Sequence, residues 1–295
     1  MMLKKILRGT GVALVTPFTP DFQVDYGALD RLIDFVLAGR VEYLVSLGTT
    51  GESVVLSRDE KEKVLAATLR KVNGRVPIVV GIGGNNTAEV IRELETFPLE
   101  GIVAVLSSSP SYSKPSQEGI FQHYKALAAA SSKPIVLYNV PGRTSSNITA
   151  ETTLRLAKEV DGIAGIKEAS GNIVQCMHVL ARCPDDFLVT SGDDHLALPL
   201  IACGMDGVIS VAANCFPGDF STLIRAALSG DFAGAQSLQF KLLEGLDLLF
   251  VENNPAGAKA FLAEYKVIMN VLRLPLVPLS EPLHKQVKAF IAKIS

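Results

Sequence analysis

Eight short apolar runs rich in valine and isoleucine recur along the chain at intervals of roughly 20 to 35 residues. Their apolar character is continuous rather than alternating, which favours strands buried on both faces, as in parallel sheets. A strand formed by such a run must therefore pack against other parts of the chain on both of its faces. The runs are Gly11–Thr16, Tyr43–Leu47, Ile78–Ile82, Ile102–Leu106, Ile135–Tyr138, Ile163–Lys167, Phe187–Thr190 and Val208–Val211.

Amphipathic segments with helix signals lie between these runs. Asp25 precedes apolar residues at helical spacing and is a candidate helix start. Ser57 with Glu60 forms a capping box, and we expect that helix to end near Asn73-Gly74. Further expected caps are Thr149, ahead of Ala150–Lys158, and Asn172, ahead of a segment that runs to Cys183.

Eight strands that each precede a helix predict an α/β chain folded as a (β/α)8 TIM barrel. An open doubly wound sheet is the main alternative, but the count of eight and the lack of a linker favour the barrel. We expect a catalytic barrel domain over residues 1–230, ending in a helix at Pro217–Gly230, and a C-terminal helical region over residues 231–295. The expected C-terminal helices are Ala233–Phe250, Pro255–Leu272 and Ser280–Ile294.

Charge and cysteine content narrow the class of protein. The net charge of −2 offers no basic surplus for nucleic acid, and no apolar stretch approaches the roughly 18 residues of a membrane span. The four cysteines show neither CxxC spacing nor the density of a disulfide scaffold. We expect reduced, mostly buried thiols in a cytoplasmic protein that binds neither nucleic acid nor membranes.

The active site of such a barrel lies at the carboxyl ends of the strands, and this rule selects Lys167. A buried amine is desolvated, which favours its neutral form, and a neutral lysine can form a Schiff base with a carbonyl substrate. The alternative is a lysine that reaches solvent or pairs with Glu168.

Neighbouring strand ends supply further candidates. Tyr138 should face the same opening as Lys167, where a phenol can shuttle protons, unless its hydroxyl is merely satisfied by backbone. Thr49 and Thr50 could relay protons or hold a carboxylate, although a tight turn uses the same residues. Arg143 could bind a carboxylate in bidentate geometry or be a solvated loop arginine.

Two other motifs could suggest a metal or a nucleotide. Asp193 and Asp194 have too few further ligands nearby, so we interpret them as a helix cap before Leu196 and predict no metal. The glycine-rich segment Gly81–Asn86 fits neither the dinucleotide-binding nor the P-loop pattern, so we interpret it as a close-packed barrel rim.

Three motifs together resemble the 4-hydroxy-tetrahydrodipicolinate synthase family, also called dihydrodipicolinate synthases, of the class I pyruvate-dependent lyase and aldolase superfamily. The motifs are Gly48–Glu52 (GTTGE), Tyr138–Thr144 (YNVPGRT) and Gly165–Ala169 (GIKEA). The resemblance covers essentially the whole chain. It implies a carbon–oxygen lyase that condenses pyruvate with L-aspartate 4-semialdehyde to 4-hydroxy-tetrahydrodipicolinate, in diaminopimelate and lysine biosynthesis. It implies no cofactor.

The resemblance also implies a catalytic set. Lys167 would form the Schiff base with pyruvate. Tyr138, Thr49 and Tyr112 would form a proton relay, with Tyr112 reaching into the site of a neighbouring subunit. The family is usually a homotetramer built from two tight dimers, so the resemblance implies an oligomer.

A binding set follows from the same resemblance. Thr50 would hold the carboxylate of pyruvate, and Gly192 and Ile209 would shape the pyruvate pocket. Arg143 would bind the carboxylate of the aldehyde. The alternative is a related aldolase for a keto-deoxy sugar acid or N-acetylneuraminate, which Arg143 disfavours because a guanidinium suits a short acidic aldehyde better than a polyol.

One stretch departs from the family pattern. Ser111 stands where the family usually has a tyrosine that lines the dimer interface and a lysine regulatory pocket. Arg58 and Lys61 stand where lysine-sensitive bacterial members often have histidines, and their charges would repel a cationic ligand. We therefore hypothesise weak or absent feedback inhibition by lysine.

Overall fold

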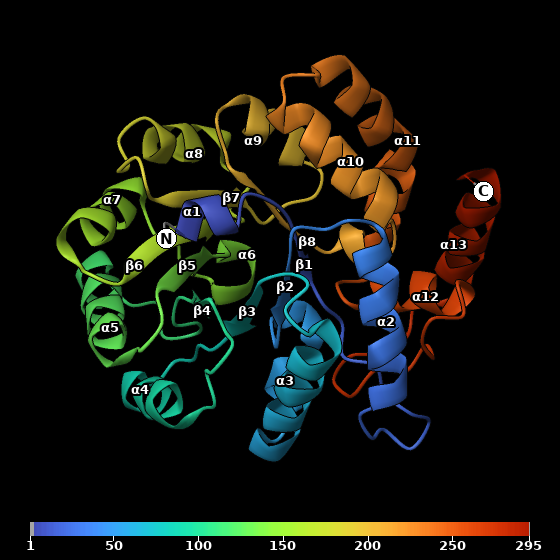
Figure 1. The fold of residues 1–295 in the computed structure, drawn as a ribbon, viewed down its shortest axis with the longest axis horizontal. Coiled ribbons are helices and arrows are strands. Elements are labelled where there is room, and N and C mark those ends of the chain that lie inside the picture. The colour runs from blue at the N-terminus through green and yellow to red at the C-terminus, as the bar shows by residue number, and fades with distance from the viewer. Residues whose placement is uncertain (1–2, 295) are drawn as a thin grey trace.

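The chain folds into a closed barrel of eight parallel strands with helices around it, and the computed structural model describes residues 3–294 (Figure 1). Each strand pairs with the next, and β8 pairs with β1 to close the barrel. This confirms the predicted (β/α)8 barrel and excludes the open sheet. The strands are β1 (Gly9–Ala13), β2 (Tyr43–Ser46), β3 (Ile78–Gly81), β4 (Ala104–Ser108), β5 (Ile135–Asn139), β6 (Ile163–Glu168), β7 (Leu188–Ser191) and β8 (Gly207–Ser210).

All eight apolar runs coincide with strands, although some ends differ. The run predicted over Gly11–Thr16 leaves the strand after Ala13, because the Val15 amide donates to the side chain of Asn214 instead of to a neighbouring strand. The run predicted from Ile102 begins at Ala104, because the Ile102 amide closes a turn onto Leu99. These shifts arise from contacts that a strand pattern does not encode.

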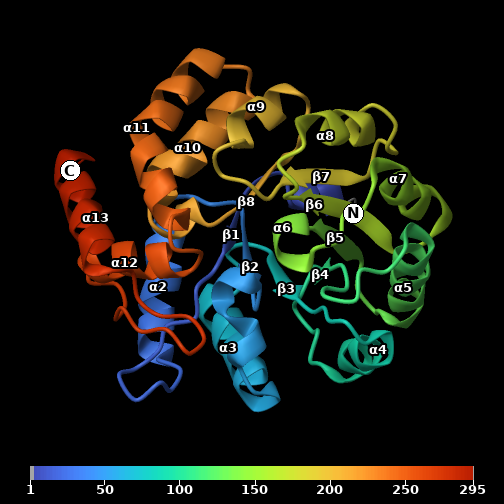
Figure 2. The same ribbon diagram turned by 180° about the vertical axis from the view of Figure 1, so that it is seen from behind.

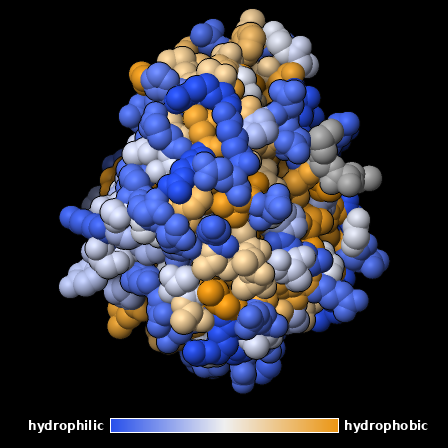
Figure 3. All heavy atoms as spheres, turned by 90° about the vertical axis from the view of Figure 1, so that its left-hand side faces the viewer, coloured by the Kyte–Doolittle hydropathy of each residue, from blue (hydrophilic) through white to orange (hydrophobic). Residues whose placement is uncertain are grey.

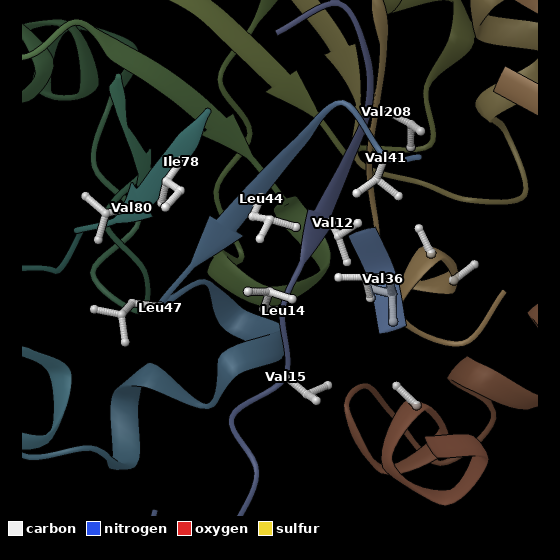
Figure 4. Close-up of a cluster of buried hydrophobic side chains, with 14 of the residues drawn as sticks. Val12, Leu14, Val15, Val36, Val41, Leu44, Leu47, Ile78, Val80 and Val208 are labelled. Carbon is white, nitrogen blue, oxygen red and sulfur yellow. The ribbon is translucent and has the colours of Figure 1, made fainter. Parts of the chain in front are cut away.

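Two buried apolar layers account for the continuous hydrophobicity of the strands. Ala13, Val45 and Leu106 belong to a cluster inside the barrel. Alternate residues such as Val12 and Leu44 belong to a second cluster between the barrel and the helices, where Val36 of helix α2 (Tyr26–Ala38) joins them (Figure 4). Successive side chains of a strand point to opposite faces, so both faces must be apolar.

Helix starts follow the predicted caps. The Asp25 side chain accepts from the Ala28 amide, and the Ser57–Glu60 capping box is present at the start of α3 (Arg58–Val72). Thr149 and Asn172 cap their helices, although the helix after Asn172 ends before Cys183. The helices of the barrel are α1 (Leu3–Ile6), α2 (Tyr26–Ala38), α3 (Arg58–Val72), α4 (Thr87–Thr96), α5 (Gln117–Ala130), α6 (Pro141–Thr144), α7 (Ala150–Glu159), α8 (Ile173–Leu180), α9 (Ala197–Ala202) and α10 (Pro217–Leu228).

Three further helices lie together on one flank of the barrel, next to α2 (Figure 2). They are α11 (Phe232–Phe250), α12 (Ala256–Glu264) and α13 (Glu281–Ile294). The prediction of one helix over Pro255–Leu272 is wrong in its length, because α12 is shorter. It ends at Glu264, because Lys266 adopts a left-handed conformation (φ 60°) and the chain continues as an irregular segment. That segment carries residues that contact the active-site loops.

No helix within residues 3–294 is long and apolar enough to cross a membrane. On the face that carries α5 and α7, polar and apolar residues are interspersed (Figure 3). Cys176 and Cys215 are buried, whereas Cys183 is half-buried and Cys203 is exposed, so the prediction of mostly buried thiols holds for only two of the four cysteines.

Candidate active site

Lys167 lies at the end of β6 directly beside Tyr138 of β5. The two residues are register partners across the strand pair, and the Lys167 ammonium nitrogen is 4.3 Å from the centre of the Tyr138 ring. Both side chains are buried. Glu168, the partner that an ion-paired lysine would need, accepts hydrogen bonds from Asn139 and Gln175 instead. The amine therefore faces the tyrosine and the barrel opening.

The space around Lys167 is shaped by Gly192, which follows β7. A β-carbon at this position would lie 2.7 Å from Cε of Lys167 and 2.7 Å from the β-carbon of Ala169. The Gly192 amide also donates to the Glu168 carbonyl at 2.7 Å, so its backbone is fixed against β6. The lysine side chain thus occupies room that only glycine leaves free.

The two threonines lie in a short 3-10 helix, η1 (Thr49–Gly51), after β2. Thr49 is exposed at the opening, whereas Thr50 is buried. The Thr16 hydroxyl donates to the Gly51 carbonyl at 2.7 Å. The Asn254 side-chain amide donates to the Thr50 hydroxyl oxygen at 2.9 Å. The threonine loop is therefore held both by the barrel and by the segment before α12.

A fully buried ion pair lies behind this loop. Glu52 and Lys259 have side chains with no solvent exposure, and Oε1 of Glu52 is 2.5 Å from Nζ of Lys259. Lys259 also donates to the Val271 carbonyl and lies over the ring of Phe18. Burial lowers the pKa of Lys259 to about 8, although the charge of Glu52 and its hydrogen bond raise it. The other carboxylate oxygen of Glu52 accepts from the Arg273 amide.

Two cavities meet at Lys167. The larger, of about 620 Å³, is within the range of small-molecule sites and contains Arg143 and Gly192 in its wall. The smaller, of about 160 Å³, lies on the Thr49 side. Thr50, Tyr138 and Lys167 line both cavities. The structure thus brings together six of the eight candidates: Thr49, Thr50, Tyr138, Arg143, Lys167 and Gly192.

Two sequence-predicted residues do not line these cavities. Ile209 is buried in the interior cluster that also contains Tyr138, and it lines neither cavity. Tyr112 lies on the loop after β4 with a left-handed backbone (φ 67°) and a side chain that is 91% exposed. Within one chain, Tyr112 is therefore outside the site.

Other residues in the wall of the larger cavity were not identified from the sequence. They include His195, Phe250 and Asn254. The His195 ring Nε2 lies 3.0 Å from Asp247 of α11. Asn254 precedes Pro255, and in the sequence an Asn-Pro dipeptide predicts only a turn. No local signal ties these residues to the barrel opening.

The carboxylates of Asp193 and Asp194 both accept hydrogen bonds from backbone amides. Asp193 accepts from the amides of His195 and Leu196, but α9 begins at Ala197 with Leu196 as its N-cap residue and without a side-chain capping bond, so the predicted helix cap is wrong and Asp193 stabilises the turn before the helix. Asp194 accepts from the amides after β8. Within residues 3–294, no group of three or more histidine, cysteine, aspartate or glutamate residues could hold a metal ion.

Known proteins match this chain over nearly its whole length. The model of the dihydrodipicolinate synthetase family matches residues 6–294. The chain is 49% identical to the 4-hydroxy-tetrahydrodipicolinate synthase of Parabacteroides distasonis, over 98% of this chain and 97% of that one. It is 50% identical to that of Flavobacterium psychrophilum, over 97% and 98%.

Solved structures agree with these matches. A monomeric dihydrodipicolinate synthase variant has a TM-score of 0.96 at 38% identity, covering 99% of this chain and 98% of that one. The chloride-inhibited dihydrodipicolinate synthase from Acinetobacter baumannii, complexed with pyruvate, has a TM-score of 0.94 at 37% identity, covering 98% and 99%.

The fold and the site together define a (β/α)8-barrel lyase with an amine and a phenol at the carboxyl ends of adjacent strands. Within that class, the chain belongs to the dihydrodipicolinate synthetase family. This confirms the family and the enzyme activity predicted from the motifs, and it disfavours the sugar-acid alternative.

Proposed function

We propose that Lys167 forms a Schiff base with pyruvate, and that the chain condenses this adduct with L-aspartate 4-semialdehyde to give 4-hydroxy-tetrahydrodipicolinate. The activity belongs to diaminopimelate and lysine biosynthesis. The observation that carries the proposal is the buried amine of Lys167 against Tyr138 at the carboxyl ends of the strands. We place the enzyme in the cytoplasm, where this biosynthetic chemistry would occur.

The chemistry begins when the neutral amine of Lys167 attacks the C2 carbonyl of pyruvate. The carbinolamine loses water to give the Schiff base, and loss of a C3 proton then gives an enamine. Tyr138 lies close enough to the amine to move protons in these steps. The adduct itself accepts the electron pair, so the proposal requires neither a cofactor nor a metal.

Carbon–carbon bond formation follows when C3 of the enamine attacks the aldehyde carbon. The amino group of the bound aldehyde then attacks C2 and displaces Lys167, which closes the ring and regenerates the amine. The whole reaction releases one water, and every atom of the product comes from the two substrates. The cavity of about 620 Å³ beside Lys167 offers room for the second substrate.

We assign the carboxylates of the two substrates to different parts of the cavity. Thr50, in the wall of both cavities, binds the pyruvate carboxylate. Gly192, in the wall of the larger cavity, shapes the pocket around the pyruvate adduct, and Ile209 supports this pocket from the buried cluster that contains Tyr138. Arg143 lines the larger cavity on the short helix α6 and binds the carboxylate of the aldehyde.

The proton relay extends beyond one chain in this proposal. Thr49 lies at the opening of the site, and Tyr112 is displayed to solvent from the loop after β4. We propose that Tyr112 completes the relay of Tyr138 and Thr49 in a neighbouring subunit of a homotetramer made of two dimers. An exposed tyrosine held in a left-handed backbone conformation supports this assignment.

Borohydride reduction in the presence of pyruvate tests the Schiff base. The expected result is a covalent adduct on the peptide that contains Lys167, detected by mass spectrometry and missing in Lys167→Ala. An unmodified wild-type protein, or an equal adduct in Lys167→Ala, would refute the mechanism.

Arg143→Ala tests the second substrate. We expect the KM for aspartate 4-semialdehyde to rise about tenfold or more, because a charge-assisted hydrogen bond is lost, while the KM for pyruvate stays near that of the wild type. Rates with a sugar-derived aldehyde serve as the comparison, and faster turnover of that substrate would favour the alternative aldolase.

A further inference from the structure

We propose that Asn254, in the C-terminal region, is a positioning residue that turns the hydroxyl hydrogen of Thr50 toward the carboxylate of bound pyruvate. The inference rests on the role given to Thr50 above and explains how its hydroxyl is prepared for that role. It assigns to the segment between α11 and α12 a part in substrate binding.

The hydrogen-bond direction carries the argument. The side-chain amide of Asn254 donates to the hydroxyl oxygen of Thr50 at 2.9 Å, and both side chains are buried. A hydroxyl that accepts from an amide keeps its own hydrogen free for another acceptor. Both residues line the larger cavity, so a ligand bound there can accept this hydrogen. A carboxylate accepts hydrogen bonds and would be repelled by a bare oxygen lone pair.

The backbone under Thr50 is fixed by the same C-terminal region. Glu52 closes η1 in a left-handed conformation (φ 52°), which a non-glycine residue keeps only when its surroundings hold it there. Its carboxylate is held by Lys259 of α12 and by the Arg273 amide. Asn254 precedes α12 by a single residue, Pro255. The Thr50 backbone and the Thr50 hydroxyl are therefore set by one structural unit.

Asn254 keeps an unpartnered buried oxygen, Oδ1, that borders the same cavity. Asn254 could therefore contact the substrate directly instead of acting through Thr50. The two possibilities make different predictions for a double-mutant cycle, because a residue that acts only through a partner loses its effect when that partner is removed.

The test is the pyruvate dependence of Asn254→Ala, Thr50→Val and the double variant. We expect Asn254→Ala to raise the pyruvate KM about tenfold with kcat changed less than about threefold, the size expected for a weakened hydrogen bond to a charged group. In the Thr50→Val background, Asn254→Ala should change the KM less than about twofold. The pyruvate concentration that gives half-maximal borohydride trapping should shift in parallel.

Asn254→Asp extends the test with a side chain of the same shape. Its carboxylate would accept the Thr50 hydrogen and turn it away from the cavity, so we expect a higher pyruvate KM than in Asn254→Ala. This variant also replaces Asn254→Ala in the cycle if the alanine variant does not fold.

Effects of Thr50→Val and Asn254→Ala that multiply would overturn the proposal in favour of direct contact. A lower kcat with an unchanged KM would overturn it in favour of a purely structural role. An unchanged KM in Thr50→Val alone would refute the function given to Thr50, and with it this inference. The borohydride adduct on Lys167 would remain, which separates this failure from a failure of the Schiff-base mechanism.

Discussion

Gly192 is the residue whose substitution should act most directly on the reactive amine. In Gly192→Ala the new β-carbon would lie 2.7 Å from Cε of Lys167, closer than real β-carbon contacts allow. The lysine side chain must then leave its present position beside Tyr138. We expect kcat to fall about 100-fold or more, since a displacement of about 1 Å at a reacting group has an effect of that size.

Gly218→Ala is the matched control for this prediction. Gly218 lies near the start of α10, and a β-carbon there would meet nothing within 4 Å. Its activity should equal that of the wild type. A Gly192→Ala variant with wild-type kcat would show that the close contact does not constrain Lys167.

A second prediction at the residue scale concerns the loop around Ser111 and the inhibition of the enzyme by lysine. Asn85 accepts from both the amide and the hydroxyl of Ser111, and Lys61 lines the smaller cavity. Lys61 pairs with Glu93 at 3.4 Å, and Arg58 pairs with Glu62. We expect no strong inhibition by sub-millimolar lysine in a steady-state titration, because Lys61 and Arg58 add positive charge and already engage Glu93 and Glu62, which would otherwise attract a cationic ligand. Strong inhibition in that range would refute the hypothesis.

At the scale of elements, the buried pair of Glu52 and Lys259 joins the threonine loop to α12. Lys259→Met leaves the carboxylate of Glu52 buried without its counter-charge, so we expect a loss of about 3 to 5 kcal/mol in the free energy of unfolding. The double variant Glu52→Gln/Lys259→Met should regain most of this loss, because no uncompensated charge stays buried. Urea unfolding of the three proteins measures the difference. A double variant no more stable than Lys259→Met would contradict this account.

A second link joins α3 to the segment after α12, and it should depend on pH. Arg273 binds the Glu60 carboxylate through two nitrogens, and this hydrogen bonding lowers the pKa of Glu60 from 4.5 to about 2. A carboxyl with a lowered folded-state pKa stabilises the protein above its unfolded pKa and loses that effect as the pH falls. Glu60→Gln should therefore lower the Tm at pH 7.

The same variant and the wild type should converge as the pH falls from 4.5 toward 2, because the carboxylate becomes protonated over that window. Thermal unfolding at pH 7, 4.5 and 3 checks the trend. A Tm difference that stays constant over this range would show that the ion pair does not contribute through its charge.

Sequence patterns predicted the elements whose signals are local. The strands follow from apolar runs, and the caps at Asp25 and Ser57 follow from side chains that bond within three residues. The end of α12 was missed because no glycine or proline marks the left-handed Lys266. The contact between Asn254 and Thr50 joins residues 204 positions apart, so no window along the chain contains it. Lys167 and Tyr138 could be placed together because barrel topology makes β5 and β6 neighbours.

At the scale of the whole molecule, Tyr112 makes a prediction about subunits. Tyr112→Phe and Lys167→Ala should each be nearly inactive alone. Refolding the two as a mixture should restore part of the activity, because a Tyr112 from one subunit can then meet a Lys167 from another. Activity of the mixture no higher than the sum of the separate variants, in a sample that is oligomeric by analytical ultracentrifugation, would place Tyr112 outside the relay.

Closure of the barrel through β1 and β8 has a consequence for protein synthesis. Gly9 pairs with Gly207 so closely that a β-carbon on Gly207 would lie 1.9 Å from the Gly9 carbonyl oxygen. On the ribosome, the edge of β1 therefore stays unpaired until nearly 200 further residues have emerged, and Thr50 stays without Asn254 for longer still. The nascent chain carries an open strand edge for most of its translation, and that interval is when it is most exposed to aggregation and most in need of chaperones.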